Sequence, residues 1–301
     1  MDITLIRTFL EVLAAGSFGG AAERLSITQS AVSLRIQRLE ETLGTALLSR
    51  SKAGAVQTPA GKEFERYALS MLNIWEEARL RVAVPEGFTK SLSIGAEHSL
   101  WPRLGFRLID GLRIVMPDLA LRADFGTPEA LTRLMVEGML HVTLMYTPTL
   151  RPGLMTKRLL DDELILVASW PDPKREDLPG RYIYSDWGPE FVHQHARHLP
   201  ELSGQGFTAA LGALTAEFIS RREFGTYLPA RQAKRYCDSG LLYRVEGAPR
   251  FPFPVWWVWR EDLDPALLDA VERVLAKVVS GIDLEVDQIM NDFVQLTNGQ
   301  G

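Results

Sequence analysis

Two helical segments near the N-terminus are separated by only three residues, and this spacing constrains the fold more than any other feature. Residues 18–25 read as a helix behind the capping residue Ser17, and Ser26-Ile27-Thr28 then interrupts the pattern. A further helix starts near Gln29, and its buried stripe consists of Val32, Ile36, Leu39 and Leu43. A break this short predicts two helices that meet at a sharp angle.

The opposite face of the helix that starts near Gln29 is polar, small and basic. With Val32 on the buried side and about 100° of rotation per residue, the outward positions are Ser30, Ser33, Leu34, Gln37 and Arg38. The whole chain has a net charge of −5, but residues 24–52 contain five Lys/Arg against two Asp/Glu. We therefore expect any surface suited to phosphate groups to lie in this segment.

The residues after this helix predict a small β-wing and then a long helix. Lys52-Ala53-Gly54 is typical of a tight turn, with Val56 in a short strand, and Thr58-Pro59 is typical of a helix start. The helix is expected to run to about Val82, with an apolar stripe of Phe64, Tyr67, Ala68, Met71, Leu72, Trp75 and Ala78. A stripe on a helix of about 30 Å needs a partner, and a second copy is the simplest one.

This arrangement suits a helix that enters the major groove of DNA. Gln29, Ser30 and Ser33 can exchange hydrogen bonds with base edges, while the basic side chains meet phosphates. The candidate DNA-binding residues are Thr28, Gln29, Ser30, Ser33, Leu34, Arg35, Arg38, Arg50, Lys52 and Thr58. The alternative is a three-helix bundle with a solvated polar face, but the short turn and the wing favour groove binding.

From residue 91 the pattern changes to alternating strands and helices. Strands are expected at residues 91–96, 119–126 and 142–147, with helices between them at about 101–116 and 128–139, which predicts a mostly parallel sheet. Further expected strands are 163–170, 181–187, 241–245 and 255–259, and further expected helices are 191–199, 209–223 and 265–280. Crossing segments near residues 162 and 255 would divide this part into two lobes with a cleft between them.

The N-terminal run closely resembles the winged helix-turn-helix of LysR-type transcriptional regulators, and the resemblance covers nearly the whole chain. It rests on Phe18, Ala21, Ala22, Leu25, Gln29-Ser30-Ala31-Val32-Ser33, Ile36, Leu39-Glu40, Leu43-Gly44, Leu47, Arg50 and Thr58-Pro59-Ala60-Gly61. The resemblance implies a linker helix that forms dimers, tetrameric assembly, and an effector domain like a periplasmic binding protein. The chain departs from the family pattern at Gly19-Gly20, which should loosen the start of the helix at residues 18–25. It also departs at Leu34, which bears on base preference, and at Ala53-Gly54-Ala55, which lacks the wing arginine that commonly enters the minor groove.

The predicted fold class is α/β, with an N-terminal winged helix-turn-helix rich in α-helix and a two-lobed, doubly wound effector domain. The expected boundaries are residues 1–58 for the DNA-binding domain, 59–88 for the linker dimerisation helix and hinge, and 89–301 for the effector domain. Lobe I is expected at about 89–161 and 256–281, lobe II at about 162–255, and a C-terminal extension at 282–301. The apolar stripe of the extension predicts packing on the body or on a sister subunit.

An effector site is expected beyond the carboxyl ends of the strands, where helix N-termini favour anions or polar acceptors. The candidate effector-binding residues are His98, Ser99, Leu100, Trp101, Tyr146, Thr147, Asp186, Trp187, Phe224 and Thr226. Resemblance to the family points to Ser99 and Thr147 as contacts in lobe I, and the aromatic rings suit a pocket that tolerates aromatic ligands. The alternative is that these residues are loop caps and core aromatics.

Several classes of function are disfavoured by what the chain contains. Cys237 is the only cysteine, and no membrane span or leader is evident, so we expect a soluble cytoplasmic protein without disulfides. The absence of a catalytic or cofactor motif disfavours an enzyme with a tethered DNA-binding head, and no cofactor is expected. His193, His195 and His198 suggest a metal sensor, but on a helix only the last two share a side, so no metal site is predicted.

The predicted partners are double-stranded DNA carrying an interrupted palindrome, a small-molecule effector, and copies of the same chain in a homodimer or homotetramer. RNA polymerase is a further candidate, because activation or repression depends on where the protein sits relative to it. A constitutive DNA-binding repressor or architectural protein without an effector stays open as an alternative.

Overall fold

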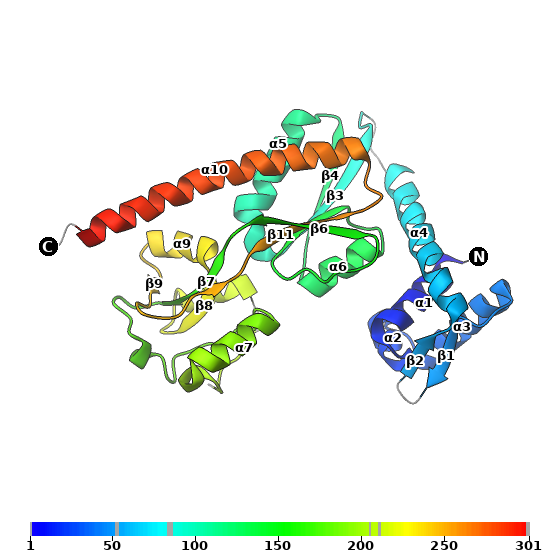
Figure 1. Ribbon diagram of the computed structural model, residues 1–301, viewed down its shortest axis with the longest axis horizontal. Helices are drawn as coiled ribbons and strands as arrows, with labels where there is room; N and C mark the ends of the chain where they lie inside the picture. The colour runs from blue at the N-terminus through cyan, green and yellow to red at the C-terminus, as the bar shows by residue number, and fades with distance from the viewer. Residues whose placement is uncertain (1, 52–53, 83–86, 205, 210–211, 299–301) are drawn as a thin grey trace.

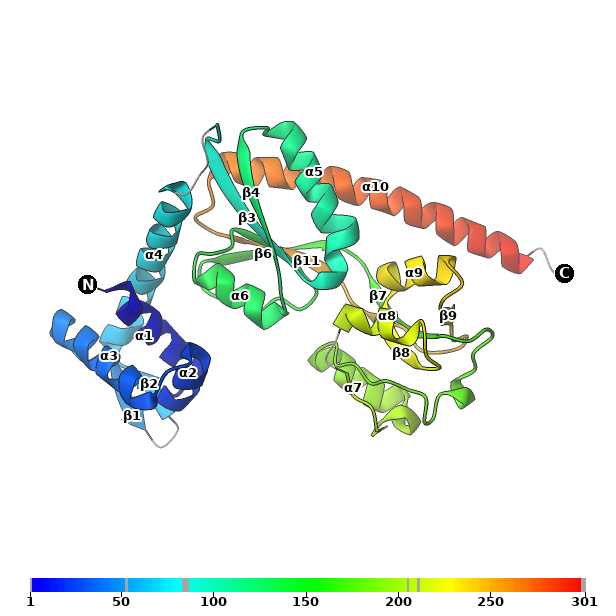
Figure 2. The same ribbon diagram turned by 180° about the vertical axis from the view of Figure 1, so that it is seen from behind.

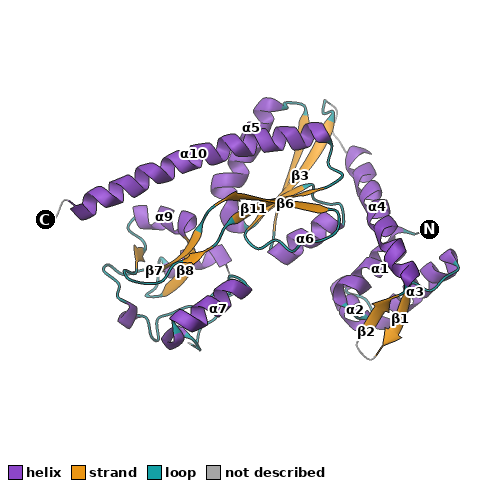
Figure 3. Cartoon of the chain, in the orientation of Figure 1, coloured by secondary structure: helices purple, strands orange, loops and turns teal. Residues whose placement is uncertain are grey.

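The computed structural model describes residues 2–51, 54–82, 87–204, 206–209 and 212–298. An N-terminal helical domain is followed by the long helix α4 and by two lobes, each built on its own sheet (Figures 1 and 2). Strands of the described residues form sheets of two, four and five strands (Figure 3). In this part of the chain, no helix has the length and apolar character that crossing a membrane requires.

The N-terminal domain consists of three helices and a two-stranded wing, followed by α4. The elements are α1 (Ile3–Ala15), α2 (Phe18–Leu25), α3 (Gln29–Leu43), β1 (Leu48–Ser51), β2 (Gly54–Gln57) and α4 (Pro59–Val82). The hydroxyls of Ser17 and Thr28 accept hydrogen bonds from the first turns of α2 and α3. Between these two helices Ser26 has a φ of 53°, so the chain turns sharply there. The predicted helix starts at Gln29 and Pro59 are confirmed.

Two glycines allow the wing and α4 to pack closely on this domain. A Cβ at Gly54 would lie 2.4 Å from the carbonyl oxygen of Gly16, and the neighbouring amide of Ala55 donates to that oxygen at 2.9 Å. A Cβ at Gly61 would lie 2.1 Å from the carbonyl oxygen of Leu47. The wing and α4 are therefore fixed to the helices through backbone contacts that exclude larger residues.

Lobe I is built on the five-stranded sheet, whose strand order is β4-β3-β5-β11-β6. Its elements are β3 (Lys90–Ala96), α5 (Phe106–Val115), β4 (Leu119–Phe125), α6 (Pro128–Val136), β5 (Val142–Met145), β6 (Leu154–Leu160), β11 (Val255–Arg260) and α10 (Pro265–Asn298). β3 pairs in parallel with β4 and β5, as predicted, whereas β11 pairs antiparallel with β5 and β6. The first turns of α10 lie against α5, where Val274 approaches Gly111 (Figures 1 and 2).

Lobe II is built on the four-stranded sheet, in which β7 pairs antiparallel with each of the other strands. Its elements are β7 (Glu163–Ala168), α7 (Pro189–His198), α8 (Thr215–Ile219), β8 (Gly225–Pro229), α9 (Ala230–Asp238), β9 (Tyr243–Arg244) and β10 (Phe251–Pro252). Single 3-10 turns lie at Arg175–Asp177, Pro200–Leu202 and Gly212–Leu214. The chain crosses between the lobes after β6 and again after β10, close to the predicted positions.

Several elements differ from the sequence predictions. The strand expected at residues 181–187 is wrong, because only isolated bridges form there, from Tyr182 to Gly225 and from Tyr184 to Thr208. The helix expected over 209–223 is limited to the 3-10 turn and α8, since the chain must turn after Ile219 to enter β8. The passage 225–238, which forms β8 and α9, was not predicted.

The helix expected to start at Trp101 begins differently. A 3-10 turn at His98–Leu100 and a π turn at Trp101–Gly105 precede the regular helix α5. Pro102 lacks an amide hydrogen, and a Cβ at Gly105 would lie 2.3 Å from Cε3 of Trp101. The wider turn therefore accommodates the Trp101 ring beside the helix axis.

Candidate nucleic-acid interface and interlobe cleft

The outward face of α3 is exposed along its length. Val32, Ile36 and Leu39 are buried against the rest of the domain, whereas Leu43, the fourth residue of the predicted buried stripe, is 38% exposed where the helix ends. On the outward side Gln29, Ser30, Gln37 and Arg38 are exposed. Leu34 lies among these polar residues with 48% of its surface exposed. The helix thus presents a polar strip with one apolar side chain, a combination suited to base edges and to thymine methyl groups.

The start of α3 is ordered by side-chain hydrogen bonds. The Thr28 hydroxyl accepts from the amide of Ala31 at 3.2 Å and shares a hydrogen bond of 2.9 Å with the Ser30 hydroxyl. The helix N-terminus and these two hydroxyls lie together at the exposed end of α3, and Ser33 is partly buried one turn further on. This end can offer both donors and acceptors to a nucleic acid.

Four of the predicted DNA-binding residues either bond to other parts of the protein or have side chains outside the described residues. Nη1 of Arg35 donates to the hydroxyl of Thr8 at 3.4 Å, so its guanidinium leans toward α1. The Thr58 hydroxyl accepts from the amide of Gly61 at 3.0 Å and donates to the carbonyl of Ala46 at 2.7 Å, so it caps α4. Arg50 lies on β1, but its side chain, like all of Lys52, is outside the described residues.

Glu40 enters the sequence predictions only as part of the family resemblance, with no role for its side chain, which holds the wing against α3. Its Oε1 accepts from the amides of Leu47 at 2.7 Å and Leu48 at 3.0 Å, where β1 begins. A charged acceptor on two backbone amides makes strong hydrogen bonds, so α3 and the wing are held in one arrangement. The only available signal was a glutamate next to the buried Leu39.

A small cleft of about 140 Å³ lies between the lobes. Lobe I contributes His98, Ser99, Leu100, Pro102, Arg103, Leu104 and Tyr146, and lobe II contributes Leu214, Glu217, Arg231, Gln232, Arg235 and Tyr236. Four predicted effector-binding residues are therefore brought together here, namely His98, Ser99, Leu100 and Tyr146. The whole wall from lobe II was missed, because most of it comes from α9.

The predicted tryptophans are placed in the core instead. Nε1 of Trp101 donates to the carbonyl of Asp124 at 3.1 Å, and Nε1 of Trp187 donates to the carbonyl of Tyr227 at 3.0 Å. Both rings are buried, and neither lines the cleft. Once its single N–H donor has an acceptor, a tryptophan ring gains more free energy from burial in the core than from an exposed position on the cleft surface.

The remaining predicted effector residues also lie outside the cleft lining. The buried Thr226 donates to the carbonyl of Ile183 at 2.9 Å, and Phe224 packs edge-on against Phe207. Asp186 accepts from the amide of Gly188 at 2.8 Å, which closes a local turn, and Thr147 is exposed near that glycine. These residues shape the loops around the cleft without facing it.

Two carboxyl groups behind the cleft have raised pKa values. Oε1 of Glu97 accepts from the amide of Tyr146 at 2.6 Å, and burial raises the pKa of Glu97 to about 7. The Tyr146 hydroxyl donates to Oδ2 of Asp162 at 3.3 Å, and burial raises the pKa of Asp162 to about 6. The charge at the back of the cleft therefore changes near neutral pH.

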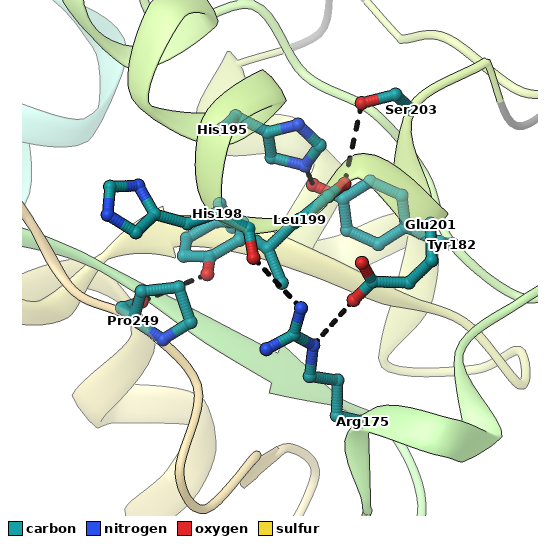
Figure 4. Close-up of polar contacts among 9 residues, drawn as sticks. Arg175, Tyr182, His195, His198, Leu199, Glu201, Ser203 and Pro249 are labelled. Atoms are coloured by element: carbon teal, nitrogen blue, oxygen red, sulfur yellow. Dashed lines mark hydrogen bonds and ion pairs between the residues drawn. The ribbon is translucent and has the colours of Figure 1, made fainter.

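The three histidines of α7 point in different directions. The His195 ring is buried and its Nε2 shares a hydrogen bond of 2.8 Å with the Tyr182 hydroxyl, whereas His198 is exposed (Figure 4). Arg175 donates to Glu201 and to the carbonyl of His198 beside them. Among the described residues, no group of three or more His, Cys, Asp or Glu is placed to hold a metal ion. This cluster contributes hydrogen bonds and ring contacts to lobe II.

Comparisons with known proteins agree with this architecture. Residues 3–62 match the family model of the bacterial regulatory helix-turn-helix protein, lysR family, and residues 85–279 match the LysR substrate binding domain. The HTH-type transcriptional regulator HdfR of Yersinia pestis (strain Pestoides F) is 31% identical over 278 residues, which are 89% of this chain and 94% of the relative.

Solved structures share the fold. ArgP from Mycobacterium tuberculosis aligns with a TM-score of 0.55 at 22% identity, over 93% of this chain and 98% of its own. Full-length LysG from Corynebacterium glutamicum with bound effector Arg aligns with a TM-score of 0.50 at 19% identity, again over 93% and 98%. With two family models that together match most of its length, the chain belongs to the LysR family of DNA-binding transcriptional regulators.

Proposed function

We propose that a small molecule in the interlobe cleft controls how this regulator binds its promoter. The observation that carries the proposal is the cleft itself, which has one wall from each lobe. Tyr146, which lines it, contacts both crossing segments, at Asp162 and Phe253. A ligand that touches Ser99 on one wall and Gln232 on the other would favour one angle between the lobes. Such a ligand shifts the equilibrium between arrangements only by its difference in affinity for them.

The cleft lining guides the choice of ligands to test. Arg103, Arg231 and Arg235 outnumber the single exposed carboxylate of Glu217, which favours molecules with an acidic group. The volume of about 140 Å³ favours small ones. The structure of LysG with bound effector Arg supports including amino acids in the first set.

A thermal-shift screen of the full-length protein tests this proposal. A ligand at 100 times its Kd stabilises by about 2.7 kcal/mol, which for a domain of roughly 200 residues raises the Tm by about 5–10 °C. Ser99→Ala should abolish the shift, while Ser203→Ala, an exposed serine of lobe II outside the cleft, should preserve it. A hit that survives Ser99→Ala would place the ligand elsewhere.

A constitutive DNA-binding regulator is the second candidate, and the size of the cleft favours it. Ligand pockets commonly measure about 300–1,000 Å³, whereas this cleft has about 140 Å³. If no metabolite shifts the melting temperature or alters DNA binding, this candidate gains support.

We further propose that α4 pairs with α4 of a second copy and that the dimer reads an interrupted palindrome. Phe64 and Ala68 are buried against the N-terminal domain, but Tyr67, Ile74 and Trp75 are 52%, 66% and 48% exposed. Two recognition helices held by such a dimer would reach half-sites about 34 Å apart. Ile74→Glu should convert dimers to monomers in analytical ultracentrifugation, whereas an unchanged mass would rule out this helix as the interface.

A further inference from the structure

One residue, Asp162, connects both crossing segments and both lobes through its side chain and its backbone carbonyl. It lies between β6 and β7, in the first segment by which the chain passes from lobe I to lobe II. Its Oδ1 accepts from the amide of Glu163 at 2.9 Å and from the amide of Arg231 at 3.4 Å. Its Oδ2 accepts from the Tyr146 hydroxyl at 3.3 Å, and its carbonyl accepts from the amide of Phe253 at 2.8 Å.

Apart from the adjacent Glu163, these partners come from three different places in the fold. Tyr146 directly follows β5 of lobe I, Arg231 lies in the first turn of α9 in lobe II, and Phe253 lies in the second crossing segment. A change in the angle between the lobes would therefore alter the hydrogen bonds by which Asp162 contacts Tyr146 and Arg231. Residues that absorb such motions are few and lie at the ends of elements, as this one does.

The two partners from the lobes are also fixed by further contacts. The Tyr146 ring stacks on Phe253, with centroids 4.1 Å apart and an interplanar angle of 16°. The Arg231 guanidinium donates to the carbonyl of Asp161 from Nε at 3.3 Å and from Nη2 at 2.9 Å. Tyr146 and Arg231 both line the cleft, so a ligand there would touch the residues that Asp162 holds.

We infer that Asp162 is a positioning residue that sets the angle between the lobes by holding Tyr146 and Arg231 together. The link from this angle to DNA binding rests on the proposed function. The role of Asp162 in setting the angle does not, because it is argued from hydrogen bonds between residues of the chain itself.

The surroundings of Asp162 make this role sensitive to protonation. Tyr146 faces its carboxylate from lobe I and Arg231 from lobe II, and Glu97 lies behind the Tyr146 peptide. The neighbouring carboxylates of Asp161 and Glu163 pair with Arg158 and Arg250. Burial raises the pKa of Asp162 to about 6. A protonated carboxyl is a weaker acceptor, so its contacts loosen as the pH falls through this value.

Small-angle scattering of the full-length protein between pH 5 and pH 8 tests the inference. The wild type should change its radius of gyration with a midpoint near pH 6, and Asp162→Asn should show no such transition. Asp161→Asn, at the exposed neighbouring position, should behave as the wild type. A transition unchanged in Asp162→Asn, or no transition in the wild type, would overturn the role of Asp162.

Two further variants separate this role from a structural one. Tyr146→Phe keeps the ring that stacks on Phe253 but removes a donor to the ionised carboxylate, so the midpoint should move to higher pH. Glu97→Gln removes the other group that titrates nearby and should leave the midpoint near pH 6. If Asp162→Asn fails to fold, a midpoint unaffected by Tyr146→Phe is sufficient to reject the inference. Failure of the ligand screen would count against the proposed function alone, since scattering requires neither ligand nor DNA.

Discussion

The candidate DNA-binding face of α3 and the interlobe cleft are built in opposite ways. The face is a strip of near neighbours on the single helix α3, whose other side is buried and whose ends are capped. The cleft combines residues from 3-10 and π turns, from the end of β5, and from α8 and α9. The first and last of these residues, His98 and Tyr236, are more than 100 positions apart in the chain. One surface therefore depends on local periodicity and the other on how two lobes meet. The two should respond to different substitutions.

The largest effect is expected from a charge on the recognition face. Ser33→Glu should weaken binding to the fragment upstream of the gene by roughly 100-fold or more, because a carboxylate near phosphates is repelled. The melting temperature and any ligand-induced shift should stay unchanged. Fluorescence anisotropy at fixed salt measures the affinity, and Ser280→Glu on an exposed turn of α10 is the control. An affinity within threefold of the wild type would remove Ser33 from the interface.

A substitution in the backbone contact of α4 should disrupt the N-terminal domain but not the lobes. A Cβ at Gly61 meets the carbonyl oxygen of Leu47 at 2.1 Å, so Gly61→Ala requires the backbone to move and should cost about 2–4 kcal/mol. Calorimetry should show an earlier transition for this domain and an unaltered one for the lobes. If both transitions move together, the two regions unfold as one unit.

A pH-dependent effect is expected for the lobes only. The folded pKa of Glu97, about 7, exceeds its ordinary value of 4.5, so its contribution to stability is greatest at low pH and is lost as pH rises toward 7. Glu97→Gln should therefore stabilise the lobes at pH 8 by about 1–2 kcal/mol after allowance for partial exposure, and have no effect at pH 4.5.

The control for this prediction is the wild type at each pH, because His141 acts in the opposite direction. Burial lowers the pKa of His141 to about 4, so acid destabilises the lobes through it in both proteins. Equal melting temperatures of the variant and the wild type at pH 8 would contradict the role given to Glu97.

The smallest effect is expected at the start of α2. A Cβ at Gly19 meets nothing within 4 Å, so Gly19→Ala should stabilise the N-terminal domain by about 0.5–1 kcal/mol through lower entropy of the unfolded chain. Gly16→Ala is the matched contrast, since Gly16 has a φ of 66° and alanine should destabilise there. Chemical denaturation resolves both changes, and the same sign for both would contradict this account.

The same contrast explains what the sequence could predict. The starts of α3 and α4 and the buried face of α3 follow from caps and a helical period, which are local properties of Thr28, Thr58 and the stripe around Val32. His98, Ser99, Leu100 and Tyr146 could be found because they follow strands whose carboxyl ends share one edge. These predictions needed no knowledge of the contacts between the lobes.

The rest could not be predicted, because it depends on tertiary contacts. Arg231 and Gln232 reach the cleft only because β8 places the start of α9 there, and β8 ends in a proline that reads as a breaker. Trp101 follows β3, and Trp187 stood at the end of the strand expected at 181–187, yet carbonyl groups in the core accept from their indoles. Nothing in the sequence distinguishes a tryptophan that lines the cleft from one that is buried in the core next to it.

The position of β11 has a consequence for synthesis of the protein. This strand lies between β5 and β6, and it follows all of lobe II in the chain. As the chain leaves the ribosome, the strand that lies between β5 and β6 in the sheet of lobe I is therefore synthesised only after lobe II is complete. The N-terminal domain is complete about 200 residues earlier. During synthesis the N-terminal DNA-binding domain can therefore fold before the sheet of lobe I, in the part proposed to sense the effector, can be completed.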